Sequence, residues 1–341
     1  MEIIIGLLII AVGSFGQSSS YVPIKRVKQW SWETFWLVQG IFAWLLFPLA
    51  GADAAVPDGV SLFSLLSAEG SWKAVAYGVL WGIGGLTFGL SMRYLGVALG
   101  QSISLGTCSA FGTLLPAIFA GTDLFHGDGL ILLLGVVITI AGISTIGYAG
   151  SLKSKAMSEE QKKEAVKDFA LGKGLAVALL AGVASACFAL GLDAGSSIKT
   201  VTLNAGCPEL TAGLPVIFLV TAGGFITNAC YCIFQNIRNH SGKEYISTPP
   251  KTLLNNLLFC CLAGGLWYSQ FFGLELGKSF LKDSPVLLAF SWSILMSLNV
   301  LFSNFWGIVL KEWKGCGKRT VATLVVGLGL LVFSIFFPSL F

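Results

Sequence analysis

Long apolar runs, separated by short polar segments, cover nearly the whole chain. A helix needs about 20 apolar residues to cross the hydrocarbon core of a bilayer, and ten runs have about this length. Their approximate ranges are 2–22, 33–51, 72–92, 95–119, 129–149, 173–198, 213–236, 253–277, 285–310 and 320–338. The pattern predicts an all-α polytopic membrane protein with ten transmembrane helices, so the lipid bilayer is its first expected partner.

Composition supports a membrane protein. Of 341 residues, 55% are hydrophobic and 11% are charged, whereas a soluble domain has about 25% charged residues. The 42 glycines agree, because small residues let membrane helices approach closely. The first five residues, from Met1 to Ile5, lack the basic region of a secretory signal, so we expect the first helix to be retained.

The positive charges alternate along the chain. Seventeen of the 21 lysines and arginines lie in one set of alternating loops, and four lie in the other set. Because cytoplasmic loops carry an excess of Lys and Arg, the richer set is predicted to be cytoplasmic and both termini extracytoplasmic. The bases sit in short loops beside the runs, so no nucleic-acid partner is expected.

A charged segment divides the chain into two sets of five runs. We therefore predict a first five-helix repeat at 1–150, a charged cytoplasmic linker at 151–172 and a second repeat at 173–341. An odd number of helices per half makes the halves inverted in the membrane, as in many transporters. A faint echo supports duplication: Trp81 precedes Phe-Gly-Leu at 88–90, and Trp267 precedes the same tripeptide at 272–274.

Enzyme motifs are missing from the sequence. It has no nucleotide-binding loop, no H-E-x-x-H and no G-x-S-x-G. The eight cysteines lack C-x2-C spacing and only two histidines occur, so we expect no metal site and no cofactor. These observations favour a binding and transport protein, driven by an ion gradient, over an enzyme.

The eighth run carries the most polar side chains. At about 100° per residue, Trp267 and Gln270 lie about 60° apart on one helical face, whereas Tyr268 and Glu275 share another. Trp267 lies near the middle of the run, and Glu275 is predicted to stay hydrated near its outer end. Aromatic rings and an amide suit a sugar, but interhelical packing explains the same residues equally well.

Two other features are candidates for function. Trp81 and Trp292 lie deep within their runs, which favours a binding role over the interfacial belt of membrane tryptophans. Glu33 opens the second run behind Lys25 and Arg26. It is either an N-terminal helix charge paired with those bases or with Arg93, or a carboxylate that couples a proton.

Several segments, in order along most of the chain, resemble the family of bacterial L-rhamnose–proton symporters. They are 21–34 (YVPIKRVKQWSWET), 81–84 (WGIG), 89–96 (GLSMRYLG), 264–268 (GGLWY), 270–272 (QFF), Gly277, 291–292 (SW), 296–297 (MS) and 310–313 (LKEW). The resemblance implies the drug/metabolite transporter superfamily, ten helices in an inverted five-plus-five repeat, and uptake of L-rhamnose with a proton across the bacterial inner membrane.

The matched positions suggest a site. The resemblance implies a sugar site lined by Trp267, Gln270, Trp292 and Trp81, with Tyr21 and Tyr268 as further contacts, and proton coupling by Glu33 near the charge of Arg93. Asp193 and Glu275 depart from the family pattern, as does Gln101. An exporter of drugs or metabolites remains an alternative, and so does a membrane receptor without net transport.

Overall fold

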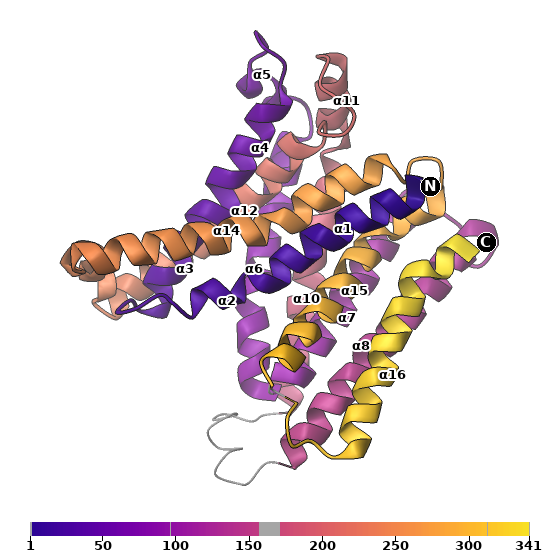
Figure 1. Ribbon diagram of the computed structural model, residues 1–341. Coiled ribbons are helices and arrows are strands. Elements are labelled where there is room, and N and C mark those ends of the chain that lie inside the picture. Colours follow the sequence, from indigo (N-terminus) through magenta and orange to yellow (C-terminus); the bar gives the residue numbers. More distant parts are fainter. Residues whose placement is uncertain (1, 96, 157–170, 312, 341) are drawn as a thin grey trace. The chain divides into compact units, whose positions relative to one another are not determined.

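The structure is a computed structural model that describes residues 2–95, 97–156, 171–311 and 313–340 (Figure 1). Within these ranges the chain is helical, with no β-strand. The helices of the first part are α1 (Glu2–Ser19), α2 (Tyr21–Ile24), α3 (Trp32–Gly40), the π-helix η1 (Ile41–Leu46), α4 (Phe47–Ala55), α5 (Leu62–Leu66), α6 (Ser71–Leu95), α7 (Val97–Phe119) and α8 (Gly127–Lys155). Those of the second part are α10 (Leu171–Ala194), α11 (Ser196–Asn204), α12 (Leu214–Arg238), η2 (Ser241–Lys243), α13 (Glu244–Ser247), α14 (Pro250–Ser279), α15 (Pro285–Val309), α16 (Lys318–Phe336) and η3 (Phe337–Leu340).

Most of these helices can cross a membrane. Among the described residues, nine helical segments are long and apolar enough to do so, and a further apolar helix at Ile103–Phe119 is shorter. The predicted all-α polytopic membrane fold is therefore confirmed. The count of ten spans and the inverted repeat stay predictions.

Two predicted runs differ in detail from the helices observed. The run 33–51 is covered by three consecutive segments, because the π-helix η1 separates α3 from α4. The run 173–198 is interrupted at Gly195, where α10 ends and the shorter α11 begins. Hydropathy alone does not show the π-helix, since the residues on both sides of it are apolar. After Gly195 the polar residues Ser196 and Ser197 follow, so the sequence did not predict that helix continues to Asn204.

Two compact units make up the structure. Unit 1 comprises the chain up to Gly82 together with Gly191–Phe280, and unit 2 comprises Ile83–Leu190 together with the chain from Leu281 onward. The boundaries fall inside α6 and α10, so each unit takes helices from both sequence halves. The repeats at 1–150 and 173–341 concern internal duplication and stay a prediction; most of the linker, 157–170, lies outside the described residues.

In unit 1, α1 lies along α14 (Figure 1). Small residues allow the close approach: a Cβ at Gly13 would come within 3.2 Å of the Cα of Gly273, and one at Gly277 within 2.8 Å of the carbonyl oxygen of Gly6. The Ser269 hydroxyl also donates to the carbonyl of Gly13 over 3.0 Å. Such small-residue seams are the usual means of tight helix packing in membranes.

The same unit packs the first half of α6 against α12. A Cβ at Gly223 would lie 2.9 Å from the Cα of Gly78, so the two backbones approach directly. Beside this contact the Thr227 hydroxyl donates to the carbonyl of Val79 over 2.8 Å. The seam fixes Trp81, one turn further along α6, against the body of the unit.

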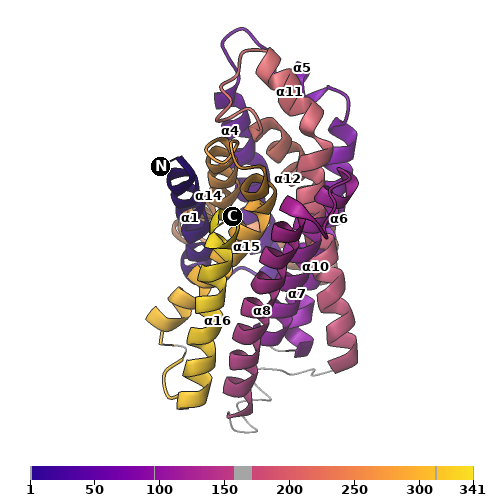
Figure 2. The same ribbon diagram turned by 90° about the vertical axis from the view of Figure 1, so that its right-hand side faces the viewer.

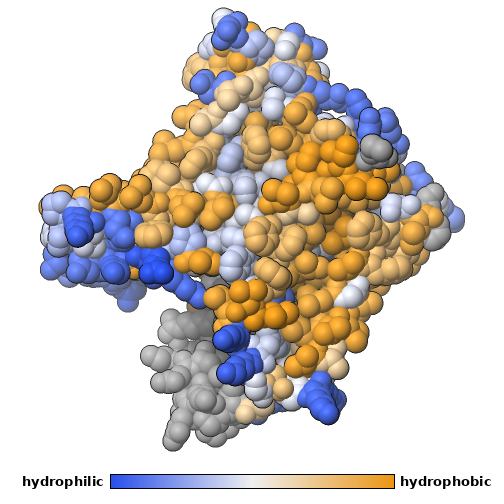
Figure 3. All heavy atoms as spheres, viewed as in Figure 1, coloured by the Kyte–Doolittle hydropathy of each residue, from blue (hydrophilic) through white to orange (hydrophobic). Residues whose placement is uncertain are grey.

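In unit 2, α8 lies beside α16 (Figures 1 and 2). Gly142 faces the side chain of Leu331, and Gly327 faces Ile146, so small residues again let the helices meet. The outward side of α16 is apolar, with Val325 61% exposed, and apolar residues cover this region in Figure 3. An apolar outer surface is what contact with lipid requires.

Candidate functional site

Five aromatic residues of unit 1 form one group, the aromatic cluster: Trp36 of α3, Trp44 of η1, Trp81 of α6, and Trp267 and Phe271 of α14. Trp44 lies at its centre, with ring centroids 5.6 Å from Trp36, 6.0 Å from Trp81 and 5.9 Å from Trp267. The three neighbours meet its ring at angles of 71–87°, the edge-to-face geometry that aromatic pairs prefer. The cluster therefore has a defined geometry.

Local backbone features make room for these large rings. A Cβ at Gly40 would lie 2.6 Å from Cζ3 of Trp44, so the indole can lie against the backbone only because residue 40 is glycine. A Cβ at Gly224 of α12 would likewise collide with the ring of Trp81. The π-helix η1 also changes the helical phase between Trp36 and Trp44, and such π-segments are frequent at functional sites.

Asn228 of α12 joins the cluster to the helix backbones. Its amide oxygen accepts from Nε1 of Trp36 over 3.0 Å, and its amide nitrogen donates to the carbonyl of Gly224 over 2.9 Å. Asn228 is buried, and a satisfied buried amide fixes the orientation of its neighbours. The rings of the cluster are therefore held by hydrogen bonding as well as by packing.

Two of the predicted sugar-site residues meet in the cluster. The ring centroids of Trp81 and Trp267 are 5.8 Å apart, although the residues are 186 positions apart in sequence. Gln270 is buried, and its amide nitrogen donates to the carbonyl of Trp267 over 3.2 Å. The face of α14 that was predicted to bind sugar thus carries the Trp267 ring and the Gln270 amide. The amide is hydrogen-bonded to the backbone of its own helix.

Tyr268 is on another face of α14. A Cβ at Gly51 of α4 would lie 2.5 Å from its hydroxyl oxygen, and its ring centroid is 6.1 Å from that of Phe272. Within the described ranges its buried hydroxyl has no hydrogen-bond partner. The side chain of Tyr21, the other predicted tyrosine, lies outside the described residues.

Trp292 lies in unit 2. It stacks on Phe188 with centroids 5.8 Å apart, and its Nε1 donates to the carbonyl of Cys108 over 3.3 Å. Its indole also lies against Gly112 of α7. Within its own unit this predicted site residue is therefore a buried packing residue with a satisfied indole nitrogen.

Glu33 is a buried carboxylate at the start of α3. It accepts from Nδ2 of Asn239 over 2.9 Å and from the Ser241 hydroxyl over 2.7 Å. Across the described parts of the chain no lysine or arginine forms an ion pair with it. The side chain of Arg93, its predicted neighbour, lies outside the described residues. Glu33 is thus held by neutral donors.

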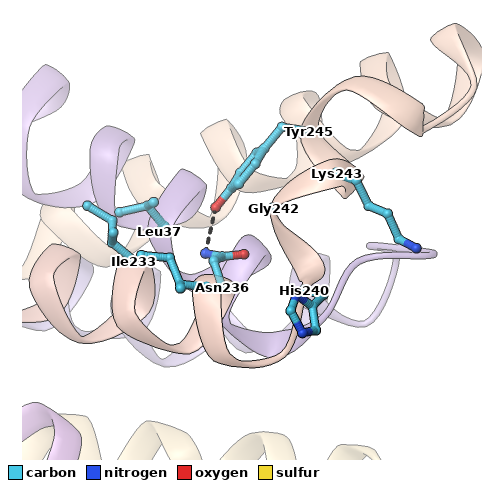
Figure 4. A pocket seen from close by; sticks show the side chains of 8 residues that line it. Leu37, Ile233, Asn236, His240, Gly242, Lys243 and Tyr245 are labelled. Atoms are coloured by element: carbon cyan, nitrogen blue, oxygen red, sulfur yellow. Dashed lines mark hydrogen bonds between the residues drawn. The ribbon is translucent and has the colours of Figure 1, made fainter.

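A hydrogen-bonded chain connects Glu33 to a pocket. The Ser241 hydroxyl lies 3.0 Å from Oδ1 of Asn236, whose amide nitrogen donates to the Tyr245 hydroxyl over 3.1 Å. Burial raises the pKa of the Tyr245 phenol, so it stays protonated at neutral pH. Figure 4 shows Asn236 and Tyr245 at the wall of this pocket. It has a volume of about 500 Å³ and is lined by Leu37, Ile233, Asn236, Ile237, His240, Gly242, Lys243 and Tyr245.

The expectation that Glu275 is hydrated at the outer end of its helix is wrong. The residue is only 6% exposed, and its Oε1 lies 2.7 Å from Nζ of Lys199. Lys199 belongs to α11, the short helix that begins after the break at Gly195. Because the predicted run ends at 198 and leaves Lys199 in the loop after it, the helix that brings this cation to Glu275 was not anticipated.

Trp44, the centre of the aromatic cluster, is a candidate site residue that the sequence pattern did not predict. Trp36, Gln39 and Asn228 are polar or aromatic residues within predicted runs, but nothing in an α-helical projection groups Trp44 with them. Residues eight apart in an α-helix lie about 80° from each other. The π-helix changes that angle, and only the glycine at position 40 hints at a ring lying across the backbone.

Together the fold and the cluster define a multi-span integral membrane protein with a buried site of aromatic rings and amides. A sequence model of the family described as L-rhamnose-proton symport protein matches residues 1–337. The L-rhamnose-proton symporters of Yersinia pestis (strain Pestoides F) and Yersinia pseudotuberculosis serotype O:1b (strain IP 31758) are each 34% identical to this chain over 330 residues. The alignments cover 95% of this chain and 94% of each relative. The chain belongs to the L-rhamnose-proton symport protein family, and the resemblance noted in its sequence is confirmed.

Proposed function

We propose that this protein imports L-rhamnose together with a proton across the bacterial inner membrane. The observation that carries the proposal is the similarity to L-rhamnose-proton symporters along nearly the full length of both chains. The proposed orientation places the loops rich in lysine and arginine in the cytoplasm and both termini outside. A symporter is a transporter and not an enzyme, in keeping with the missing enzyme motifs.

The sugar binds at the aromatic cluster in this proposal. L-rhamnose is a 6-deoxyhexose with an apolar C–H face and a methyl group, which the ring surfaces of Trp81 and Trp267 accommodate, and with hydroxyls that need amide or indole partners. Gln270 is proposed to lie at this site as well. Tyr21 and Tyr268 complete the proposed sugar-site residues of unit 1. The role of Trp292, in unit 2, stays a prediction from the family resemblance.

Glu33 is the proposed proton carrier, and the family resemblance assigns the charge of Arg93 to the same step. Its partners, Asn239 and Ser241, are neutral, so protonation does not break an ion pair. When Glu33 is ionised, the Ser241 hydroxyl donates to it. When Glu33 is protonated, its O–H donates to Ser241, and the serine hydroxyl turns to the amide oxygen of Asn236, 3.0 Å away. The proton thus changes the bonds between α3 and the segment that follows α12.

Transport follows alternating access. The drug/metabolite transporter architecture, with inverted repeats at 1–150 and 173–341, gives two structurally related halves whose rocking exposes the site to either side. Proton and sugar bind from outside and are released together to the cytoplasm. The proton gradient sets the direction of sugar transport. This follows because the outward-facing and inward-facing states each favour binding of both ligands or of neither.

Uptake into proteoliposomes tests the function. Purified protein is reconstituted, the lumen is made alkaline relative to the outside, and labelled L-rhamnose is added. We expect accumulation above the external concentration, and its collapse when a protonophore is added. Uptake that reaches only equilibrium, with or without the gradient, would contradict symport.

A further inference from the structure

Four buried polar side-chain atoms of unit 1 have no hydrogen-bond partner among the residues that the structure describes: Oγ of Ser14, the Tyr268 hydroxyl, Oε1 of Gln39 and Nε1 of Trp44. The last two belong to one helical stretch beside the aromatic cluster, and Gln39 and Trp44 are 2% and 4% exposed. Buried polar groups are almost always bonded, because an unmade bond leaves the loss of hydration uncompensated. One unpaired acceptor and one unpaired donor therefore require an explanation.

The two side chains come from adjacent turns of one continuous helical stretch. Gln39 lies at the end of α3 and Trp44 lies in η1. π-helical bonding joins residues five apart, as the donation from Phe47 N to the carbonyl of Phe42 shows, and so changes the direction of the η1 side chains from that of a continued α-helix. The Trp44 ring also lies back against Gly40, the residue after Gln39. Both atoms therefore belong to one short helical stretch that also carries Trp44 into the aromatic cluster.

Their surroundings are aromatic. Trp44 contacts the rings of Trp36, Trp81 and Trp267, and Nε1 of Trp36 is already bound to Asn228. The unpaired donor of Trp44 thus lies among ring surfaces, and the indole nitrogen of one of them, Trp36, is already satisfied. The ligand that suits this arrangement has an apolar face and at least one group that both donates and accepts.

We propose that Gln39 Oε1 and Trp44 Nε1 form a subsite for one hydroxyl of the sugar, which donates to the glutamine and accepts from the indole. A hydroxyl has one donor and free acceptor lone pairs. An anion would face the acceptor oxygen of Gln39 without a donor of its own, and a cation would face the N–H of Trp44. The assignment rests on the proposed function and names residues outside the set inferred from the family resemblance.

Thermal stability separates a ligand subsite from a structural contact. Gln39→Met keeps the length of the side chain and removes the amide. Without sugar, we expect the melting temperature in detergent to stay the same or rise, because an unpaired buried acceptor is gone. With L-rhamnose, we expect most of the sugar-induced rise seen in the unaltered protein to be lost, because that rise depends on affinity.

Specificity gives the second readout. The 2-deoxy, 3-deoxy and 4-deoxy analogues of L-rhamnose compete with labelled L-rhamnose for uptake in proteoliposomes. The unaltered protein should bind the analogue lacking the recognised hydroxyl about tenfold more weakly than L-rhamnose. Gln39→Met and Trp44→Phe should each reduce discrimination against that one analogue to about twofold or less, and leave discrimination against the other two unchanged.

Matched substitutions serve as controls. Gln235→Met removes an amide bonded to Tyr231, and Trp72→Phe alters an indole that is 70% exposed; neither should change the specificity profile. The proposal is overturned if Gln39→Met lowers the melting temperature without sugar and keeps the full L-rhamnose response, or if both cluster variants weaken all analogues by one common factor. If the unaltered protein neither binds nor transports L-rhamnose, the proposed function itself fails.

Discussion

Removal of Lys199 should expose how much the buried Glu275 depends on its partner. Lys199→Met leaves a carboxylate that is 8% exposed at its side chain without the ammonium group 2.7 Å away. Coulomb's law at that distance and an effective dielectric constant of about 20 gives roughly 6 kcal/mol of attraction, which the desolvation of both ions largely offsets.

The net effect follows from this balance. Removing one partner of a buried pair typically costs about 3–5 kcal/mol. The Lys199 side chain is 36% exposed, so solvent screens the pair, and we expect a loss of about 3 kcal/mol. Glu275→Gln combined with Lys199→Met leaves no buried charge in the pair and should recover most of that loss.

Unfolding by denaturing detergent measures both variants and their combination. A coupling free energy of about 2 kcal/mol or more in the double-mutant cycle is expected, because the two residues act as a unit. Strictly additive effects, each below about 0.5 kcal/mol, would refute the reasoning, since they would show that the carboxylate is hydrated and the pair contributes nothing.

Three further predictions concern unit 1. Glu33→Gln should abolish gradient-driven accumulation of L-rhamnose and preserve counterflow exchange, which needs no net proton movement; loss of both in a folded variant would argue against a coupling role. Gly273→Leu should lower stability in detergent by about 3 kcal/mol, because a Cβ there meets the carbonyl of Ile9 at 3.0 Å, whereas Gly329→Leu, with nothing within 4 Å, should change it by less than about 0.5 kcal/mol. Gly40→Val should displace the ring lying across it and weaken L-rhamnose affinity about tenfold, or about 1.4 kcal/mol, as measured by competition for uptake; unchanged affinity would show that the ring position does not matter for binding.

The membrane fold could be predicted because its cause is local. Runs of about 20 apolar residues require a spanning helix, whatever they pack against. The π-helix at Ile41–Leu46 could not be read from hydropathy, since it occurs between apolar residues and depends on backbone hydrogen bonds. The helix after Gly195 was missed because its polar residues, Ser196, Ser197 and Lys199, are typical of a loop. The sequence also did not show which helices form each compact unit, because the packing of α1 against α14 joins segments that are far apart in the chain.

The site was predictable only in part for a similar reason. Trp81 and Trp267 were singled out by their depth and by the family resemblance, and the structure brings them together. Trp44 was missed because its place depends on π-helical phase and on Gly40. The pairing of Glu275 was missed because its partner, Lys199, was assigned to a loop and lies instead on the short helix α11.

If proton and sugar enter together, sugar uptake removes protons from the external medium, and the external pH records this movement. Proteoliposomes are placed in a lightly buffered medium with no imposed gradient, and the external pH is recorded as L-rhamnose is added. The account predicts an immediate external alkalinisation that is absent with a sugar the protein does not transport and absent in Glu33→Gln. Rhamnose entry without any change in external pH would contradict symport.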